Sequence, residues 1–468
     1  MSGNINDSIP LLQPIYKPHP WRWYILTSLA LFAFSHGINL LTFASVYRYA
    51  SEYYQVTEIE INYISSIYFI GGVVGAPLGM YVMDTFSLRE ALWLGTILNF
   101  LGTSIRLLSA YLPMNIPYLG YVTAIIGQFT IALAQSYALI SPAKLASVWF
   151  AENERVLANS IATLSGVLGN GASMLVSTAI VQSTGNLPIL LIATTVLSFV
   201  AMAMTVFGVW KKKPTVPPSP SAEEGMKTLP GVKKLLRNWR FLFLCVVWML
   251  QGGMGNSFLV LYPQFICPYG YSQLYAGIIG SIGILSGMII GIFVGYFVDR
   301  TKWFEEVSKF TMGISILCSI LILEVFRIPN QPYLVAFAEI SYAIFAIIQI
   351  PVFMELAVEV TYPIAVATCS GILYTCGELF GSVLTFSAPY FGKQPDSKYI
   401  HISQCGVSVN TTVNSSIQGL DYTYFLYFTN ALSIAVLIVY VFGFKPKYNR
   451  ISAEREIKRQ QQVEAQVM

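Results

Sequence analysis

Charged residues are almost absent from about a dozen long stretches of this chain. Asp, Glu, Lys and Arg make up 11% of the sequence and apolar residues 55%. A helix of about 20 apolar residues spans the hydrocarbon core of a bilayer, and in lipid only helices or closed barrels satisfy every backbone polar group. The apolar runs are too long and continuous for barrel strands, which alternate over about 10 residues. We therefore expect a polytopic, all-α membrane protein.

The apolar runs divide into two groups. A polar stretch at 211–239, rich in Pro, Ser and charge, cannot span and is typical of a linker. We expect an N-terminal tail at 1–22, a six-helix bundle at 23–210, the linker at 211–239, a second six-helix bundle at 240–443 and a C-terminal tail at 444–468. The expected spans are 23–47, 59–83, 89–111, 118–140, 155–181, 187–210, 240–264, 274–298, 307–327, 332–356, 364–391 and 422–443.

The distribution of basic residues predicts the orientation, because Lys and Arg concentrate in cytoplasmic loops. We place both ends of the chain in the cytoplasm. Of the 27 basic residues, those that then fall outside are Arg48, Arg106, Arg327, Lys393 and Lys398. The longest outside loop, 392–421, carries glycosylation triplets beginning at Asn410 and Asn414, and such triplets are used only on the lumenal side.

Two of the six cysteines differ from the rest by their position. Cys267 and Cys405 fall on the oxidising side, whereas the others lie inside apolar runs as small packing residues. A disulfide between the loop after the seventh span and the loop after the eleventh is therefore a hypothesis, since distance cannot be read from sequence. A dileucine pattern at Leu11 and a tyrosine-based pattern at Tyr448 leave both the plasma membrane and the endolysosomal membrane open as locations.

The same sequence pattern occurs in a loop of each half. The second span ends in glycine and runs into Asp84 and then Arg89, and the eighth runs into Asp299 and Arg300. Duplicated six-helix halves are typical of parallel-repeat transporters, and these loops resemble the signature of the major facilitator superfamily. The resemblance implies that Asp84, Arg89, Asp299 and Arg300 act as cytoplasmic latches of the outward-open state. Ordinary solvated loop charges are the alternative.

Glycine stripes occur in the second, fifth, eighth and eleventh spans, at spacings that place each stripe on one helical face. In the major facilitator fold these four helices form the seam between the halves. We therefore expect the second span to contact the eleventh, the fifth to contact the eighth, and the stripes to face the seam.

Longer motifs narrow the family. The segments Ala134–Ser136, Ser141–Phe150, Asp299–Lys302 and Met354–Pro363 resemble solute carrier family 49, the feline leukaemia virus subgroup C receptor-related transporters. Within that family the chain is most similar to the major facilitator domain-containing protein seven branch. The resemblance implies transport of heme, choline, ethanolamine or a vitamin.

The resemblance also carries over to single positions. Gln135 matches a cavity glutamine of the family, and Glu378 stands where a second one is found. The aromatic positions that surround choline in the family match Leu40 and Asn256 here. A quaternary ammonium would lose its cation–π partners, which are worth about 2 kcal/mol when desolvated.

Glu378 lies near the middle of its span, where a charge costs about 2.5–3.5 kcal/mol. It could be the counter-ion of a cationic substrate or a proton-coupling carboxylate, and a protonated carboxyl bonded inside the bundle is the alternative. His36 and Asn39 share one face of the first span. His36 is either a proton relay or a neutral buried histidine.

Other polar residues are assigned by their position in the spans. We expect Trp248, Gln251 and Asn256 of the seventh span and Tyr374 of the eleventh to complete the lining of a substrate cavity. We expect Glu355 and Glu359 to pair with Lys144, Arg155 or the latch bases at the cytoplasmic side. The residues expected to snorkel at the outer rim are Arg106 and Glu324.

These features predict a secondary transporter that moves a small organic solute by alternating access. An amine-bearing or cationic metabolite is the first substrate hypothesis and heme the second. No nucleophile–base set, metal cluster or phosphate-binding loop stands out, so we expect neither an enzyme nor a cofactor. The expected partners are the solute, the lipid bilayer and a coupling proton, with no nucleic acid. The alternative is a membrane receptor or sensor of the same fold that does not transport.

Overall fold

The computed structural model describes residues 19–113, 116, 118–151, 154–214, 228–364, 366–400, 402–405 and 419–452. The predicted glycosylation sites Asn410 and Asn414 lie outside these residues. The side chains of the two predicted latch acids, Asp84 and Asp299, likewise lie outside the described part of the chain.

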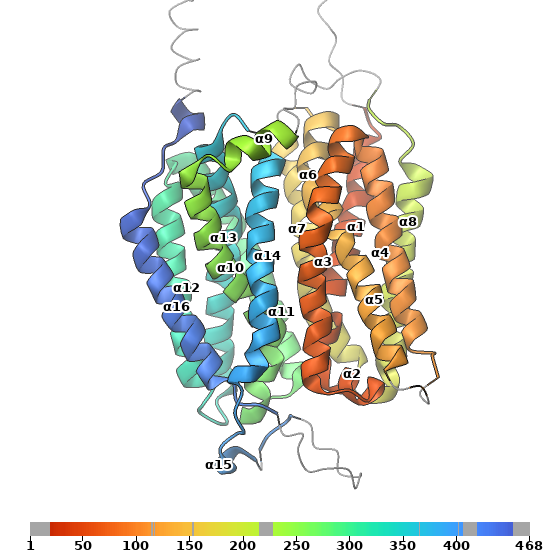
Figure 1. The fold of residues 1–468 in the computed structure, drawn as a ribbon, viewed down its shortest axis with the longest axis vertical. Helices are drawn as coiled ribbons and strands as arrows, with labels where there is room; N and C mark the ends of the chain where they lie inside the picture. Colours follow the sequence, from red (N-terminus) through yellow and green to blue (C-terminus); the bar gives the residue numbers. More distant parts are fainter. Residues whose placement is uncertain are drawn as a thin grey trace, which may run out of the picture.

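The described chain is a bundle of long helices (Figure 1). Its first half consists of α1 (Arg22–Ser45), α3 (Glu58–Thr85), α4 (Leu88–Ser109), the pair α5 (Leu119–Leu133) and α6 (Gln135–Trp149), α7 (Arg155–Ile180) and α8 (Leu187–Gly208). Its second half consists of α10 (Trp239–Ile266), α11 (Gln273–Thr301), α12 (Phe304–Val325), α13 (Pro332–Thr361), α14 (Val366–Phe391) and α16 (Thr423–Gly443). Short elements join them: α2 (Tyr47–Tyr54), η1 (Thr184–Asn186), α9 (Thr228–Leu235), η3 (Cys267–Tyr269) and α15 (Ser397–Ile400).

These helices agree with the predicted twelve-span fold. Among the described residues, 11 segments are long and apolar enough to cross a membrane, with α5 and α6 forming one of them. The remaining long helix, α7, has 26 residues and is rich in Gly, Ser and Asn, which make it less apolar than the others. One predicted boundary is wrong, because the fourth span does not end at residue 140. It continues through Pro142 as α6 to Trp149.

The fourth span is broken at Ala134, between α5 and α6. The amide of Ala134 bonds to the carbonyl of Ile131 at 2.9 Å, and the carbonyl of Ala134 accepts from Tyr137 at 3.1 Å, so the chain tightens locally to a three-residue spacing. The break is eight positions before Pro142 and has no proline of its own. Its consequence is positional, because Gln135 becomes the first residue of α6.

The seam between the halves consists of α3 against α14 and α7 against α11, and this confirms the predicted pairs of helices. The predicted direction of most glycine stripes is wrong. Gly75 lies against Leu133 of its own half, and Gly169 lies against α1 near Ile38. The stripe of α14 turns mainly toward α10, where Gly381 lies against Asn256. The stripes therefore let helices within one half approach closely. Helix association in a bilayer depends on such close packing, because lipid tails leave no hydrophobic driving force between helices.

The two ends of the bundle are packed differently. We call the end with α9 the linker end and the end with α2, η3 and Cys267 the disulfide end (Figure 1). Buried apolar clusters toward the disulfide end contain residues of both halves, such as Leu41 with Phe258 and Tyr47 with Cys267. At the linker end, each cluster stays within one half. The halves are therefore joined by buried apolar packing at the disulfide end.

Two glycine-to-alanine substitutions should separate close packing from helix propensity. A Cβ at Gly169 would lie 3.0 Å from the Ile38 amide nitrogen and closer still to the Phe34 carbonyl, whereas a Cβ at Gly295 meets nothing within 4 Å. Alanine favours a helix by about 1 kcal/mol over glycine, while overpacking costs about 1–3 kcal/mol. We expect Gly169→Ala to lower the melting temperature of the purified protein and Gly295→Ala to leave it unchanged or raise it. Equal melting temperatures would contradict this account of the α1–α7 contact.

Candidate functional site

A buried amide and a buried carboxyl meet across the seam near the middle of the bundle. The Gln135 side-chain nitrogen, on α6, donates a hydrogen bond to Oε1 of Glu378 on α14. The exposed fractions of Gln135 and Glu378 are 5% and 3%. The break at Ala134 places Gln135 at the start of α6, and Glu378 lies in the middle of its helix. In the described part of the chain, no Lys or Arg forms an ion pair with Glu378.

Gly72 of α3 forms a third side of this pair. A Cβ at position 72 would collide with both Oε1 of Gln135 and Oε2 of Glu378. The two oxygens therefore converge on one point of bare α3 backbone. Oε1 of Gln135 is buried and has no hydrogen-bond partner in the described structure. The sequence analysis did not select Gly72, because it lies beside the glycine stripe rather than in it.

A chain of hydrogen bonds begins beside this pair and runs into the first half. The Tyr68 hydroxyl of α3 is close enough to Glu378 to interact electrostatically. That hydroxyl shares a 2.6 Å hydrogen bond with Nε2 of His36, whose Nδ1 is 3.3 Å from Oδ1 of Asn99. The predicted residue His36 is thus hydrogen-bonded to a tyrosine that lies near Glu378. Tyr68 and Asn99 were not selected from the sequence.

Arg106 lies in the same network, and the prediction that it snorkels at the rim is wrong. Its side chain is fully buried. The guanidinium carbon lies 4.6 Å from the centre of the Phe43 ring. Nη1 donates to the side-chain oxygens of Asn39 at 3.3 Å and Gln128 at 3.0 Å. Nε and Nη2 have no partner among the described residues. The planar guanidinium carries several donors in fixed directions, and neutral side-chain oxygens satisfy only part of them here.

The predicted residues of α10 do not form one group. Trp248 packs on Phe353 with ring centroids 5.2 Å apart, and Asn256 lies against Gly381 of α14. Gln251 lies on another face of α10 and lines a separate cavity within the second half. Tyr374 of α14 is near Glu378, as expected from its position one turn away.

The predicted latch bases have local partners at the linker end. Arg89 forms an ion pair with Glu90 at 2.6 Å and donates to the Trp210 carbonyl at 2.8 Å. The guanidinium of Arg300 lies 5.3 Å from the centre of the Tyr296 ring. These contacts lie within one half or on one helix.

Glu355 and Glu359 of α13 contact the chain after α16. Glu355 pairs with Arg450 at 3.7 Å, and Oε2 of Glu359 accepts from the backbone amide of Ile451 at 3.3 Å. These two contacts fasten the start of the C-terminal segment to α13. Both acids have further interactions, so these bonds do not exclude the pairings expected from the sequence.

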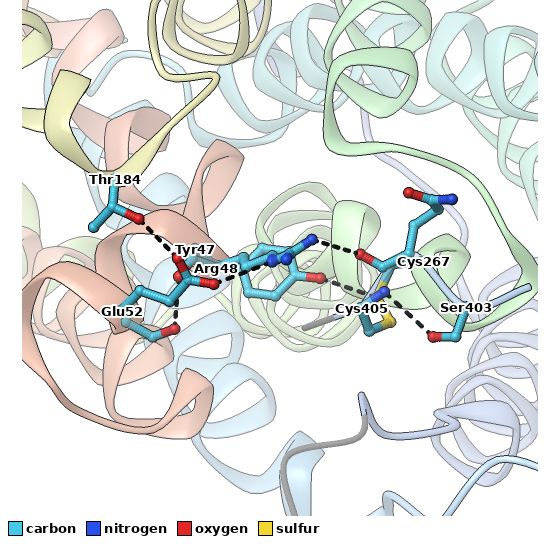
Figure 2. A network of polar contacts seen from close by, with 9 residues as sticks. Tyr47, Arg48, Glu52, Thr184, Cys267, Ser403 and Cys405 are labelled. Carbon is cyan, nitrogen blue, oxygen red and sulfur yellow. Dashed lines mark hydrogen bonds and ion pairs between the residues drawn. A yellow bond between two sulfur atoms is a disulfide. The ribbon is translucent and has the colours of Figure 1, made fainter. Parts of the chain in front are cut away.

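At the disulfide end, polar contacts join the halves beside a disulfide. Cys267 and Cys405 are bonded, with their Cα atoms 5.1 Å apart. Figure 2 shows Tyr47 and Arg48 of α2 pointing toward this bridge. The Tyr47 hydroxyl donates to Sγ of Cys267 at 2.9 Å, and Arg48 donates to the Gln404 carbonyl at 3.3 Å. Burial raises the pKa of Tyr47 well above its usual range, so its hydroxyl keeps the proton it donates.

A reciprocal amide pair reinforces this end. Nδ2 of Asn62 donates to Oε1 of Gln264 at 3.0 Å, and Nε2 of Gln264 donates back to Oδ1 of Asn62 at 2.5 Å. Asn62 belongs to α3 and Gln264 to α10, so the pair crosses between the halves. Both side chains are buried.

One further carboxyl was missed by the sequence analysis. Glu339 of α13 is 5% exposed, and its Oε2 has no hydrogen-bond partner in the described structure. The available signal was an acid well inside the predicted span 332–356, where a charge is costly, the same signal that selected Glu378.

Comparison with known proteins identifies the superfamily of the chain and some of its relatives. The sequence profile of the Major Facilitator Superfamily matches residues 27–385. Solute carrier family 49 member A3 of Xenopus tropicalis is 29% identical over 456 residues, covering 94% of this chain and 90% of that protein. The choline/ethanolamine transporter FLVCR1 of Felis catus is 26% identical, covering 78% and 67%. These matches confirm the resemblance to solute carrier family 49.

Solved structures with little sequence identity share the fold. The inward open conformation of the xylose transporter XylE from E. coli has a TM-score of 0.66 at 14% identity, covering 91% of this chain and 97% of that chain. The nucleoside transporter NupG has a TM-score of 0.63 at 17% identity, covering 92% and 100%. They confirm two six-helix halves.

Proposed function

The chain belongs to the Major Facilitator Superfamily, and on this premise we propose that it carries a small primary amine across the membrane, with Glu378 as the group that binds the ammonium. That it is a multi-pass secondary transporter follows from the family. The proposal concerns the substrate class and the residues that bind it. Its main support is the convergence of two acceptor oxygens, on Gln135 and Glu378, at the seam.

The chemistry of the pair favours a primary over a quaternary amine. Oε1 of Gln135 lacks a donor and lies beside a buried carboxyl without an ion-pair partner in the described chain. A primary ammonium has three N–H donors and can bond both oxygens, as a lysine ammonium does. A quaternary ammonium has none and depends on aromatic faces. Relatives are named choline/ethanolamine transporters, and ethanolamine is the primary amine of the two.

The position of the pair also supports alternating access. Gln135 belongs to one half and Glu378 to the other, so an ammonium bound between them touches both halves at once. The cost of burying the Glu378 charge is relieved when a cation binds. Occupancy of the site would therefore change the energy of the seam, which is what a transporter requires of its substrate.

We expect Glu378→Gln to abolish most uptake of radiolabelled ethanolamine into proteoliposomes, by about tenfold or more, because the neutral amide loses a charge-assisted hydrogen bond. Glu324→Gln, which neutralises an exposed carboxyl of α12, should transport at the wild-type rate. Choline should compete weakly with ethanolamine. Full uptake by Glu378→Gln, or choline uptake that exceeds ethanolamine uptake, would contradict the proposal.

Transport should also depend on pH through Glu378. The groups that face it are Gln135, Tyr68 and Tyr374, with His36 beyond Tyr68. A proton on the carboxyl competes with the amine, whereas an alkylammonium keeps its charge between about pH 5 and 8. The KM for uptake should therefore rise as the pH falls, and in the residual uptake of Glu378→Gln it should stay constant. A KM that is independent of pH in the wild type would remove Glu378 as the competing group.

We propose that the linker end is cytoplasmic, which makes the structure inward-facing because the halves are joined by buried packing at the opposite end. The basic residues at the linker end support this orientation, among them Lys211, Lys212, Lys233, Lys234, Arg240 and Lys445. Glycosylation mapping tests it. We expect the protein made in animal cells to lose mass with N-glycosidase, and the Asn410→Gln, Asn414→Gln double variant to lose none. Resistance of the wild type to the enzyme, with cytosolic labelling of loop 392–421, would reverse the orientation.

A further inference from the structure

A small polar cavity lies inside the second half, away from the seam. Its described lining residues belong to α10, α12, α13 and α16, all of the second half. The space available to the centre of a water-sized sphere is about 20 Å³, and about 10–15 Å³ is enough for one water. The cavity therefore suits one occupant of the size of a water molecule or a small ion.

The cavity is separated from the Glu378 site by α10. Gln251, Met254 and Phe258 line the cavity at spacings of three and four, which is one face of the helix. Gly253 and Asn256 are on the opposite face and lie against α14. The two sites therefore lie on the two sides of one helix.

Three hydroxyls of the lining donate their protons to backbone carbonyls. Ser257 donates its proton to the Met254 carbonyl at 3.2 Å, and Ser315 donates to Met312 at 2.9 Å. The Thr429 hydroxyl donates to the carbonyls of Phe425 and Leu426 in its own helix, at 3.1 Å and 3.2 Å. Each hydroxyl has one proton and two lone pairs, so these three groups have no donor left but keep acceptor capacity. Ser315 uses one of its lone pairs to accept from Nε2 of Gln349 at 2.9 Å and keeps the other.

A fourth oxygen adds to this set and has no partner at all. Oε1 of Gln251 is buried without a hydrogen bond in the described structure, and the residue is only 8% exposed. The lining thus offers hydroxyl and amide oxygens from α10, α12 and α16 to one cavity. We propose that this cavity is a binding site for Na⁺, coordinated by Gln251, Ser257, Ser315 and Thr429.

The residue types that line the cavity favour a monovalent over a divalent cation. Ca²⁺ and Mg²⁺ in proteins are bound mainly by carboxylates, and no Asp or Glu among the described residues lines this cavity. A water molecule can donate only two hydrogen bonds, so it leaves part of a four-acceptor set unsatisfied. A monovalent cation can contact every oxygen.

The proposal goes beyond the transported substrate and does not depend on its identity. A Na⁺ ion at this place would tie α10 to α12 and α16, and so hold the helix whose other face packs on α14. Its direct consequence is a Na⁺-dependent stability of the protein. Amine uptake need not be measured to test it, so its failure and the failure of the amine proposal are distinguishable.

The test follows the melting temperature of the purified full-length protein in NaCl, and in equimolar KCl and N-methylglucamine chloride. We expect a saturable rise with Na⁺ alone. Thr429→Val removes one ligand oxygen and should raise the half-saturating Na⁺ concentration about tenfold. Gln251→Glu gives one ligand a charge and should lower that concentration.

Thr311→Val is the matched control. Thr311 is a buried threonine of α12 that also donates to its own helix, at 2.8 Å and 3.2 Å, and it does not line the cavity. The Thr311→Val substitution should leave the half-saturating Na⁺ concentration unchanged. Direct binding of radiolabelled Na⁺ to the wild type decides the question if a variant does not fold. Equal melting in the three salts and no bound radiolabel would mean that the cavity holds water only, and would overturn the proposal.

Discussion

Polar groups inside a bilayer must find their partners within the protein, because lipid offers none. The hydrogen bonds inside this bundle follow from that requirement. Arg106 is satisfied in part by Asn39 and Gln128, and His36 by Tyr68 and Asn99. Against this background, a buried acceptor without a donor is informative. Oε1 of Gln135 and Oε1 of Gln251 are two such atoms, and each belongs to a site that we assign to a cation.

The two ends of the seam differ in how they join the halves. At the disulfide end, the Asn62–Gln264 pair and the Tyr47–Cys267 contact join the halves with buried polar groups. Toward the linker end, the ion pairs of Arg89 with Glu90 and of Glu355 with Arg450 stay within one half or reach the chain after α16. Moving to the opposite state requires breaking the buried amide pair, which leaves its polar atoms to be rehydrated. That cost opposes separation of the halves at the disulfide end.

The fold was predictable from sequence to a larger extent than the site. Continuous apolar runs determine helices in lipid, so the spans were located within a few residues, apart from the extension of α6 to Trp149. Glu378 was found because a lone acid in an apolar run is costly. Glu339 carries the same signal and was overlooked. The role of Gly72 and the direction of Gln251 could not be predicted, because both depend on how neighbouring helices are rotated, and hydropathy does not report rotation.

The rotation of α10 connects the two proposed sites. One face of this helix, at Gly253 and Asn256, packs so closely on α14 that a Cβ at Gly253 would lie 2.8 Å from the Gly381 amide nitrogen. The opposite face carries Gln251 into the cavity. A well-packed interface has discrete arrangements rather than a continuum. An ion that fixes α10 against α12 and α16 therefore also limits the positions of α14, and with them the position of Glu378 relative to Gln135. The occupancy of the cavity and the geometry of the amine site are thus linked through one helix.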